Sequence, residues 1–361
     1  MVKDRRSLII LGTRGIPASH GGFETFADHL AHYLASRGWR VIVYCQEDGT
    51  GNIRQSQLND IELVHVPVKG SGPLSTIKFD LRCIVHSLRY KGVFLTLGYN
   101  TAIFNGMYRL FRRTNLINMD GLEWKRAKWG SMAKGWFWIN ERLGCWFGNH
   151  LIADHPEIAR HLASRVSASK ITMIPYGADE IASADESAVT AMGLSPGGYM
   201  LVIARLEPEN SVLEIVSGFS ARSRPFELVV VGPFDPASNS YHARLDSAAS
   251  SQVHFVGAIY EDSTVRALRY FARAYIHGHQ VGGTNPSLVE AMGAGNAILA
   301  HDNKFNRWVT RDSSLYFTDA SGVSELVEKI QDNDNMLSSL QQASAEIFSR
   351  SFRWDCILEQ Y

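Results

Sequence analysis

Short apolar runs alternate with helical apolar spacing from one end of this 361-residue chain to the other. Residues 8–11 predict a buried strand, and apolar residues then recur at helical spacing between Phe23 and Leu34. The same alternation predicts strands at residues 41–45, 62–66, 93–97 and 116–119, and helices at residues 79–88 and 102–112. Strand–helix alternation of this kind is typical of a parallel sheet covered on both faces. We therefore predict a doubly wound α/β domain.

The pattern begins again near residue 199. Strands are predicted at residues 199–204, 226–231, 253–256, 275–277 and 296–300, and helices at residues 211–219 and 286–292. The polar, small-residue stretch 182–198 is typical of a linker. We therefore expect a first domain over residues 1–185 and a second over residues 186–350. Ligands of such sheets lie beyond the carboxyl ends of the strands, so the expected site is a crevice between the domains.

Composition excludes several classes of function. Lys+Arg and Asp+Glu both number 36, and no nucleic-acid-binding motif occurs, so a nucleic-acid partner is not expected. No run approaches the roughly 20 apolar residues that span a bilayer. Residues 8–11 are too short for a signal peptide behind the basic N-terminus. The four cysteines lie far apart without ligand spacing, and Cys45 and Cys83 fall in apolar segments. A reduced, cytoplasmic location is expected.

The first candidate motif is the glycine-rich turn at residues 12–22, between a strand and a helix. Glycines allow backbone N–H groups to approach an anion, and the following helix N-terminus adds favourable partial charge. Arg14 could also pair with a phosphate. The turn is longer than G-x-G-x-x-G, which favours a ligand-binding loop. A tight strand-to-helix connection without a ligand is the alternative.

Two motifs of the second domain also suit a diphosphate. Arg205 follows the first predicted strand, although an isolated arginine there is more commonly a surface residue. The loop at residues 278–285 opens a helix near Pro286, so the amides of residues 284–288 can cap an anion. Glu290, one turn into the helix, can accept hydrogen bonds from ribose hydroxyls or simply face the helix dipole.

Neither candidate metal motif predicts a metal. His277 and His279 stand two residues apart on a predicted strand, and no third ligand accompanies them. The sequence Asp332-Asn333-Asp334 matches D-x-D, but it lies between two helical patterns, where a turn with an N-cap is expected.

Five of the eight tryptophans lie within residues 124–146, interspersed with lysine and arginine. Aromatic rings beside basic side chains suit the interface with an anionic lipid. Stacking on sugar rings and packing in a large core are the alternatives. A lipid-diphosphate-linked acceptor would account for both the basic and the aromatic residues.

Together these motifs resemble a known family. Arg205, Gly232-Pro233, Gly257, the glycine-rich loop and Glu290 resemble the retaining glycosyltransferases of the GT-B fold, family 4. Residues 12–17, 21–24 and 119–129 are similar to the rhamnosyltransferase-type subgroup of bacterial capsule and exopolysaccharide assembly. The resemblance implies two Rossmann-like domains facing a central cleft, with residues 351–361 beginning a helix that crosses back to the first domain.

The resemblance also implies roles for individual residues. Arg205 would grip the donor diphosphate, Glu290 would hold the ribose, and Asp120 would lie near the reacting sugar; these three are the predicted catalytic residues. The predicted donor-binding residues are Gly15, Gly21, Gly22, Arg205, Asn210, Gly232, Gly283, Thr284, Asn285, Ser287, Leu288 and Glu290. Two positions depart from the family: Gly282 stands where a glutamate is usual, and Asn210-Ser211 where a lysine is usual.

The predicted function is transfer of a sugar from a nucleotide diphosphate-sugar to a saccharide, without a metal or other cofactor. The predicted donor is dTDP-L-rhamnose, because a 6-deoxy sugar with few hydroxyls is compatible with Gly282. The acceptor would be a saccharide or a polyprenyl-diphosphate-linked saccharide at the cytoplasmic face of the membrane. Two alternatives stay open: a sugar-nucleotide-binding module without catalysis, and a sugar-nucleotide epimerase of the same fold.

Overall fold

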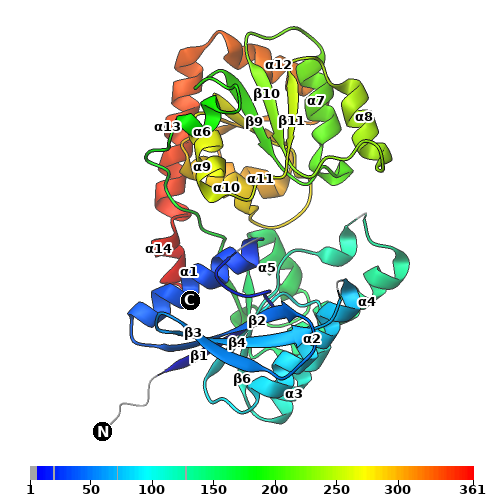
Figure 1. Cartoon of the computed structure of the whole chain (residues 1–361), viewed down its shortest axis with the longest axis vertical. Helices are drawn as coiled ribbons and strands as arrows, with labels where there is room; N and C mark the ends of the chain where they lie inside the picture. Colours follow the sequence, from blue (N-terminus) through cyan, green and yellow to red (C-terminus); the bar gives the residue numbers. More distant parts are fainter. Residues whose placement is uncertain (1–5, 19–20, 71, 127) are drawn as a thin grey trace. The chain divides into compact units, whose positions relative to one another are not determined.

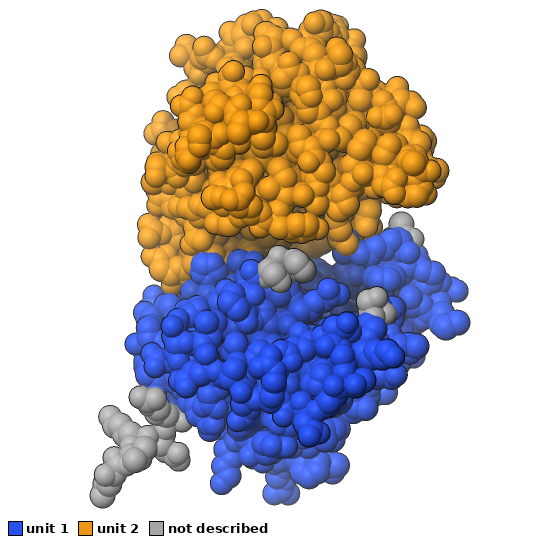
Figure 2. Space-filling model, in the orientation of Figure 1, with its two compact units in different colours: residues 1–175, 358–361 blue, residues 176–357 orange. Residues whose placement is uncertain are grey.

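The computed structural model describes residues 6–18, 21–70, 72–126 and 128–361. The chain divides into two compact units, which Figure 2 colours separately. The first unit comprises Met1–Pro175 with Leu358–Tyr361, and the second comprises Tyr176–Ile357. The basic N-terminus considered as a leader, and residues 19 and 20 of the glycine-rich turn, lie outside the described residues.

The first unit contains an eight-stranded sheet in the order β3-β4-β2-β1-β5-β6-β7-β8. Every strand pairing is parallel except that of β3 with β4. The strands are β1 (Ser7–Leu11), β2 (Arg40–Asp48), β3 (Arg54–Leu58), β4 (Ile61–Val68), β5 (Val93–Leu97), β6 (Thr114–Asn118), β7 (His150–Ala153) and β8 (Ile171–Met173). The helices are α1 (Gly22–Ser36), α2 (Pro73–Ser87), η1 (Ala102–Asn105), α3 (Gly106–Leu110), η2 (Glu123–Lys125), α4 (Ser131–Phe147), α5 (Pro156–Ala163) and η3 (Ala168–Lys170) (Figure 1).

Apolar side chains of the central strands form the core of the first unit. On one face, Ile9 and Ile42 pack against Phe79 and Cys83 of α2 and Tyr108 of α3. Strands buried on both faces need continuous apolar runs, which is why β1, β2 and β5 are visible in the sequence. The predicted core positions of Cys45 and Cys83 are confirmed, because both side chains are buried.

The second unit contains a six-stranded, wholly parallel sheet in the order β11-β10-β9-β12-β13-β14. Its strands are β9 (Tyr199–Ile203), β10 (Glu227–Val231), β11 (Val253–Gly257), β12 (Ala274–His277), β13 (Ile298–His301) and β14 (Ser314–Phe317). Its helices are α6 (Ser187–Thr190), η4 (Pro208–Asn210), α7 (Val212–Ser220), α8 (Ser240–Ala248), α9 (Asp262–Tyr270), α10 (Pro286–Gly293), α11 (Lys304–Thr310), α12 (Ala320–Gln331), α13 (Asp334–Ser351) and α14 (Trp354–Leu358), the last ending on a residue assigned to the first unit.

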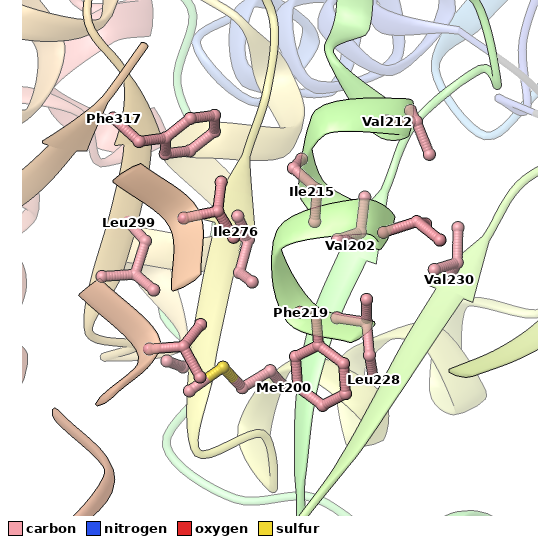
Figure 3. Packing of buried hydrophobic residues seen from close by; sticks show 14 of the residues in the cluster. Met200, Val202, Val212, Ile215, Phe219, Leu228, Val230, Ile276, Leu299 and Phe317 are labelled. Atoms are coloured by element: carbon pink, nitrogen blue, oxygen red, sulfur yellow. The ribbon is translucent and has the colours of Figure 1, made fainter. Parts of the chain in front are cut away.

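Two apolar layers cover the two faces of this sheet. Figure 3 shows the first, in which Val202 and Leu228 of the strands meet Ile215 and Phe219 of α7. The second packs the strands against α9, α10 and α13. The stretch predicted as a linker belongs to this second layer, since Val189 and the side chain of Leu194 are buried in it. That prediction was wrong because the short α6 contributes apolar side chains among its polar ones.

Both units are doubly wound α/β structures, as predicted. In the first sheet the chain leaves β1 toward β2 and leaves β5 toward β6, in opposite directions. In the second sheet the same reversal separates β9 from β12. Loops that follow such a pair of strands diverge to opposite faces and leave room for a ligand at the carboxyl ends. These two positions, the carboxyl ends of β1 and β5 in the first sheet and of β9 and β12 in the second, are called the switch points below.

Candidate functional site

Arg205 lies at the switch point of the second unit, two residues after β9. Its side chain is 52% exposed, and its Nη1 lies 3.9 Å from the Glu207 carboxylate. An ion pair at that distance and exposure is weak. The guanidinium therefore remains accessible to a stronger anion at the carboxyl end of the sheet, which is the position predicted for it.

The loops that follow β9 and β12 are packed backbone against backbone. The Gln280 N–H donates to the Glu209 carbonyl at 3.0 Å. Gly278 allows this approach, because a Cβ on it would lie 2.1 Å from the Asn210 carbonyl oxygen. The Asn210 side chain is buried and donates to the Arg205 carbonyl at 2.7 Å. Asn210, predicted as a donor-binding residue, thus acts here as a support for the Arg205 loop.

The N-terminus of α10 faces the same switch point. The Asn285 side chain accepts from the Ser287 N–H at 3.0 Å, and the Leu288 N–H donates to the Asn285 carbonyl at 3.2 Å. The Ser287 hydroxyl lies 2.5 Å from the Tyr275 hydroxyl and 3.2 Å from the Ile203 carbonyl, which it contacts as donor. Two of the amides predicted to cap an anion are therefore satisfied within the helix start. An anion there would replace the Asn285 side chain as the acceptor of the Ser287 N–H.

Glu290 has a cationic partner that the sequence did not indicate. Arg269 Nη2, on α9, lies 2.5 Å from Glu290 Oε2. The Arg269 side chain is buried, whereas the Glu290 side chain is 31% exposed. The pair orients Glu290 while leaving part of the carboxylate accessible to a hydroxyl. Arg269 carries no motif, so only the fold brings it to Glu290.

The remaining predicted residues of the second unit lie around this point. Gly232 follows β10, and a Cβ on it would lie 2.1 Å from the Ala204 carbonyl oxygen, so the loop after β9 requires glycine there. Gly283 and Thr284 lie in the loop between β12 and α10, and Thr284 is buried. The fold therefore gathers Arg205, Asn210, Gly232 and residues 283–290 at one end of one sheet.

The glycine-rich turn lies at the switch point of the first unit. Gly12 has φ +82°, and a Cβ on it would lie 2.2 Å from the Leu97 carbonyl oxygen, so the turn can pass this close to the end of β5 only with glycine here. The Arg14 N–H donates to Glu24 Oε1 of α1 at 2.9 Å. Gly15 packs against Cys45, while Gly21 and Gly22 form the start of α1. One amide predicted to meet a phosphate is therefore already paired with a carboxylate.

Asp120 follows β6 in a left-handed backbone conformation, with φ 51°. Residues other than glycine rarely adopt this conformation, and such positions cluster at functional sites. Its Oδ1 accepts from the Gly121 N–H at 2.7 Å. Burial raises the pKa of Asp120 to about 6, with the Glu123 carboxylate adding to the effect. A carboxyl titrating near neutrality suits proton transfer.

A buried carboxylate holds the loop that follows Asp120. Glu141 of α4 is fully buried. Its carboxylate accepts hydrogen bonds from the Trp124 indole and from Arg165 Nε, the latter at 3.1 Å. It also lies 3.0 Å from His161 Nε2. Burial acts to raise the pKa of Glu141, but the hydrogen bonds from His161, Trp124 and Arg165 hold it below its usual range. Glu141 is a structural anchor that sequence reasoning missed, since its partners are distant in the chain.

A cavity of about 260 Å³ opens at the same switch point of the first unit. Leu11 and Gly12 line it from β1 and the turn, Leu97 and Gly98 from β5, and Asp80 from α2. The Thr101 hydroxyl donates to Asp80 Oδ2 at 2.7 Å. Burial raises the pKa of Asp80 to about 6, and the bond from Thr101 offsets only part of this. Asp80 was not predicted, because a single aspartate in a helical pattern carries no signal.

The tryptophan-rich segment does not form a core. None of the five side chains is buried: Trp138 is 43% and Trp146 is 58% exposed, and Trp124, Trp129 and Trp136 are partly exposed. The Arg142 guanidinium lies 3.2 Å from the centre of the Trp138 ring. Core packing, one of the alternatives for this segment, is therefore excluded.

Other sequence expectations can be settled briefly. Asn333 is the N-cap of α13 and accepts from the Met336 N–H at 3.0 Å, as predicted for the D-x-D segment. His277 is buried and stacks on His279 with ring centres 4.5 Å apart. Within the described residues, no group of three or more His, Cys, Asp and Glu side chains is gathered as metal ligands. No helix in the described part of the chain is long and apolar enough to cross a bilayer.

Comparison with known proteins places this fold. Residues 5–179 match the family model described as a domain of unknown function, DUF1972. No curated protein matches the sequence. Solved structures match over nearly the whole chain at low identity. Sucrose-phosphate synthase from Thermosynechococcus elongatus is 17% identical with a TM-score of 0.80, covering 99% of this chain and 97% of that one.

Two further structures are similar. Anabaena HepE, in complex with UDP and glucose, is 13% identical with a TM-score of 0.76 and coverages of 99% and 98%. An α,α-trehalose-phosphate synthase (UDP-forming) from Burkholderia xenovorans, in complex with glucose-6-phosphate, is 12% identical with a TM-score of 0.75 and coverages of 98% and 98%. The chain therefore has the GT-B fold of these glycosyltransferases. Its two Rossmann-like units agree with the fold predicted from the sequence.

Proposed function

We propose that the chain is a metal-independent glycosyltransferase that uses a nucleotide diphosphate-sugar. The observation that carries this proposal is the second unit's switch point, where half-exposed Arg205 and the N-terminus of α10 follow adjacent strands. A guanidinium and helix N–H groups suit a diphosphate, and they stabilise negative charge on it as the glycosidic bond breaks. The similar structures that contain UDP or glucose support the same class of donor.

Two carboxylates receive distinct roles in this proposal. Glu290, oriented by Arg269, accepts hydrogen bonds from the ribose hydroxyls. Asp120 positions the transferred sugar or assists proton transfer, with the pKa near 6 favouring the second role. The family resemblance implies retention of configuration by same-face attack, in which a leaving-phosphate oxygen takes the acceptor proton. Asp120 is then not a nucleophile.

For the donor we propose dTDP-L-rhamnose. Gly282 occupies the position where relatives carry a glutamate, and its φ of +140° is a conformation that other residues rarely adopt. A glutamate would therefore be strained there, so the carboxylate that relatives place near the donor sugar has no simple equivalent. A 6-deoxy sugar presents fewer hydroxyls and loses less from that substitution.

A panel of nucleotide sugars tests the donor. We expect dTDP-rhamnose at 100 times its Kd to stabilise the protein by about 2.7 kcal/mol in a thermal-shift assay, and to be hydrolysed slowly without an acceptor. Arg205→Ala should lower transfer at least ~100-fold. Arg350→Ala, which removes another exposed ion-paired arginine of the same unit, should leave transfer unchanged. Near-normal transfer by Arg205→Ala, or loss of activity on chelation, would contradict the mechanism, and a shift with UDP-hexoses alone would contradict the donor.

For the acceptor we propose a polyprenyl-diphosphate-linked saccharide of bacterial surface polysaccharide synthesis, met at the membrane surface. The supporting feature is α4, whose burial pattern is inverted. Its buried face carries Asn140 and Glu141, whereas Met132, Ile139 and Trp146, spaced seven residues apart, are 89%, 48% and 58% exposed. Residues at that spacing share one helix face, so α4 presents an apolar stripe outward.

Basic side chains accompany this stripe. Arg142 lies against Trp138 on α4, and Arg109 ends the adjoining α3, where Leu110 is 77% exposed. Exposed apolar and basic groups on one helix pair suit an anionic lipid surface. Cosedimentation with vesicles tests this. The chain should bind vesicles containing anionic lipid, and Ile139→Ser with Trp146→Ser should weaken binding at least 10-fold while Val281→Ser, exposed in the other unit, should not. Equal vesicle binding by all three proteins would refute membrane contact through α4.

A further inference from the structure

The cavity at the first unit's switch point has a use that the donor site does not explain. It lies beyond the carboxyl ends of β1 and β5, enclosed by α2 and by the start of η1. This is the position at which a doubly wound sheet ordinarily holds a ligand. Its volume of about 260 Å³ is just below the roughly 300–1,000 Å³ of ordinary small-molecule pockets. The cavity therefore suits a single sugar ring.

The lining of the cavity is polar, and its side-chain groups are those that bind hydroxyls. The Asp80 carboxylate offers acceptor positions beyond the one used by Thr101. Thr76, Gln46 and Asn100 add further donors and acceptors around it. Phe79, which is buried in the core, contributes an apolar part of the lining. A ring that carries several hydroxyls can satisfy these groups at once.

The charges around the cavity oppose an anion. Among the described lining residues, Asp80 and Glu24 carry carboxyl groups and Arg14 is the one cation. The Arg14 side chain is exposed, while Asp80 is partly buried and has no cationic partner within the described part of the chain. A phosphate in this cavity would face the Asp80 carboxylate with little compensation, because like charges repel strongly at a partly buried site.

We propose that this cavity binds an uncharged sugar residue of the acceptor, that Asp80 accepts hydrogen bonds from its hydroxyls, and that the acidic lining excludes sugar phosphates. The proposal rests on the proposed function, since it assigns the acceptor end of that reaction. It also separates this chain from similar structures whose names or bound ligands include a sugar phosphate. The raised pKa of Asp80 agrees with a carboxyl that lacks a cation.

Saccharide binding by the full chain, without any nucleotide sugar, tests the proposal. The ligands are methyl α-D-glucopyranoside, methyl α-L-rhamnopyranoside and glucose 6-phosphate, titrated by ligand-observed NMR at pH 7.5. At least one neutral glycoside should bind 10-fold or more tightly than the phosphate. Asp80→Asn should weaken the neutral ligand by roughly 10-fold, the effect of one lost charged hydrogen bond, and should narrow its preference over the phosphate. Asp60→Asn, an exposed aspartate of the same unit, should change neither affinity.

Three outcomes would overturn the proposal: equal or tighter binding of glucose 6-phosphate by the natural chain, no binding of either neutral glycoside, or identical behaviour of Asp80→Asn and Asp60→Asn. Thr101→Val removes the donor that orients Asp80 and keeps the test decisive if Asp80→Asn fails to fold. Failure here is distinct from failure of the proposed function. The Arg205→Ala test of the proposed function concerns the second unit, whereas the saccharide titration concerns Asp80 of the first unit and requires no nucleotide sugar.

Discussion

The two switch points of this molecule have the same topology and opposite electrostatic character. At β9 and β12, half-exposed Arg205 and the N-terminus of α10 offer positive charge. Of the carboxylates there, Glu290 is paired with Arg269 and Glu207 lies 3.9 Å from Arg205. At β1 and β5, the cavity holds Asp80, which has no cationic partner among the described residues, and burial raises its pKa to about 6. The one cation of the described lining, Arg14, has an exposed side chain. Under the two proposals, the same end of a parallel sheet binds an anion in one unit and a neutral polyhydroxyl ligand in the other, according to a few side chains.

This difference shows that the fold determines where a ligand site lies, whereas the side chains of the loops determine the chemistry of that site. Backbone N–H groups and diverging loops are present at both sheets because the topology creates them. In the proposals above, the charged side chains at each switch point select the class of ligand, and the two units differ in how their carboxylates are compensated. In the second unit, the Glu290 carboxylate is paired with Arg269. In the first unit, burial raises the pKa of both Asp80 and Asp120. Removing these charges one at a time therefore tests the comparison.

The largest effect is expected at Asp120. Asp120→Asn retains a side chain that tolerates the left-handed backbone and that can accept from the Gly121 N–H. It removes the titratable group, so transfer should fall roughly 10²- to 10⁴-fold, the usual range for a general acid or base. The affinity for the free nucleotide, assigned to the other unit, should change less than about 3-fold, within the error of additive, distant sites. Steady-state transfer rates and nucleotide titration measure the two quantities.

A change in transfer of under threefold would limit Asp120 to a backbone role. Parallel loss of nucleotide affinity would contradict the division of labour between the units. Asp60→Asn again serves as the control for removal of an acidic charge from the first unit.

Asp80 provides a stability test of the same idea. Because its pKa is raised to about 6, the folded protein binds more protons than the unfolded chain between about pH 4 and 6. Stability associated with Asp80 is therefore greatest below about pH 4 and is lost as the pH rises through 6. Asp80→Asn has no carboxyl to ionise, so its stability does not fall in this way as the pH rises. At pH 7.5 the free energy of unfolding of the variant should therefore exceed that of the natural chain by at most about 3 kcal/mol.

Denaturant unfolding at pH 4.5 and 7.5 measures this difference, which should shrink at the lower pH. A variant less stable than the natural chain at pH 7.5 would show that the ionised carboxylate is well compensated. That result would remove the contrast between the two switch points, since it would imply a cation near Asp80.

Much of the fold was predictable, and the misses have one physical origin. Strands buried on both faces, such as β5 (Val93–Leu97), appear as continuous apolar runs, and their bounds agree with the prediction. The edge strand β3 (Arg54–Leu58) reads RQSQL and carries no apolar pattern, because its side chains are largely exposed. The predicted linker at residues 182–198 failed because tertiary packing buries Val189 despite polar neighbours.

The site follows the same rule. Arg205 and the loop before α10 were predictable because glycines and a strand end mark them locally. Arg269, Glu141 and Asp80 were missed, because each acts through a partner that is between 17 and 24 residues away in the chain. A single sequence contains no record of such pairings. Motifs formed by neighbouring residues can therefore be predicted from the sequence. Whether a charged side chain has an oppositely charged partner in the fold cannot.

The smallest expected effect concerns the pair formed by Glu290 and Arg269. Arg269→Lys keeps a positive charge beside Glu290 but replaces the planar guanidinium, which fixes a carboxylate better than an ammonium does. If Glu290 holds the ribose, the affinity for a nucleotide should fall only about 3- to 10-fold, about 1 kcal/mol. The loss of affinity caused by Arg269→Lys should be smaller for a nucleotide that lacks the hydroxyl bound by Glu290, because that nucleotide makes no hydrogen bond to Glu290 even in the natural chain. Titration of UDP and its 2′- and 3′-deoxy analogues against Arg269→Lys, with Arg350→Lys as control, distinguishes orientation from mere stability. An equal loss of affinity for all three nucleotides would mean that Arg269 supports the fold and that Glu290 does not bind the ribose hydroxyls.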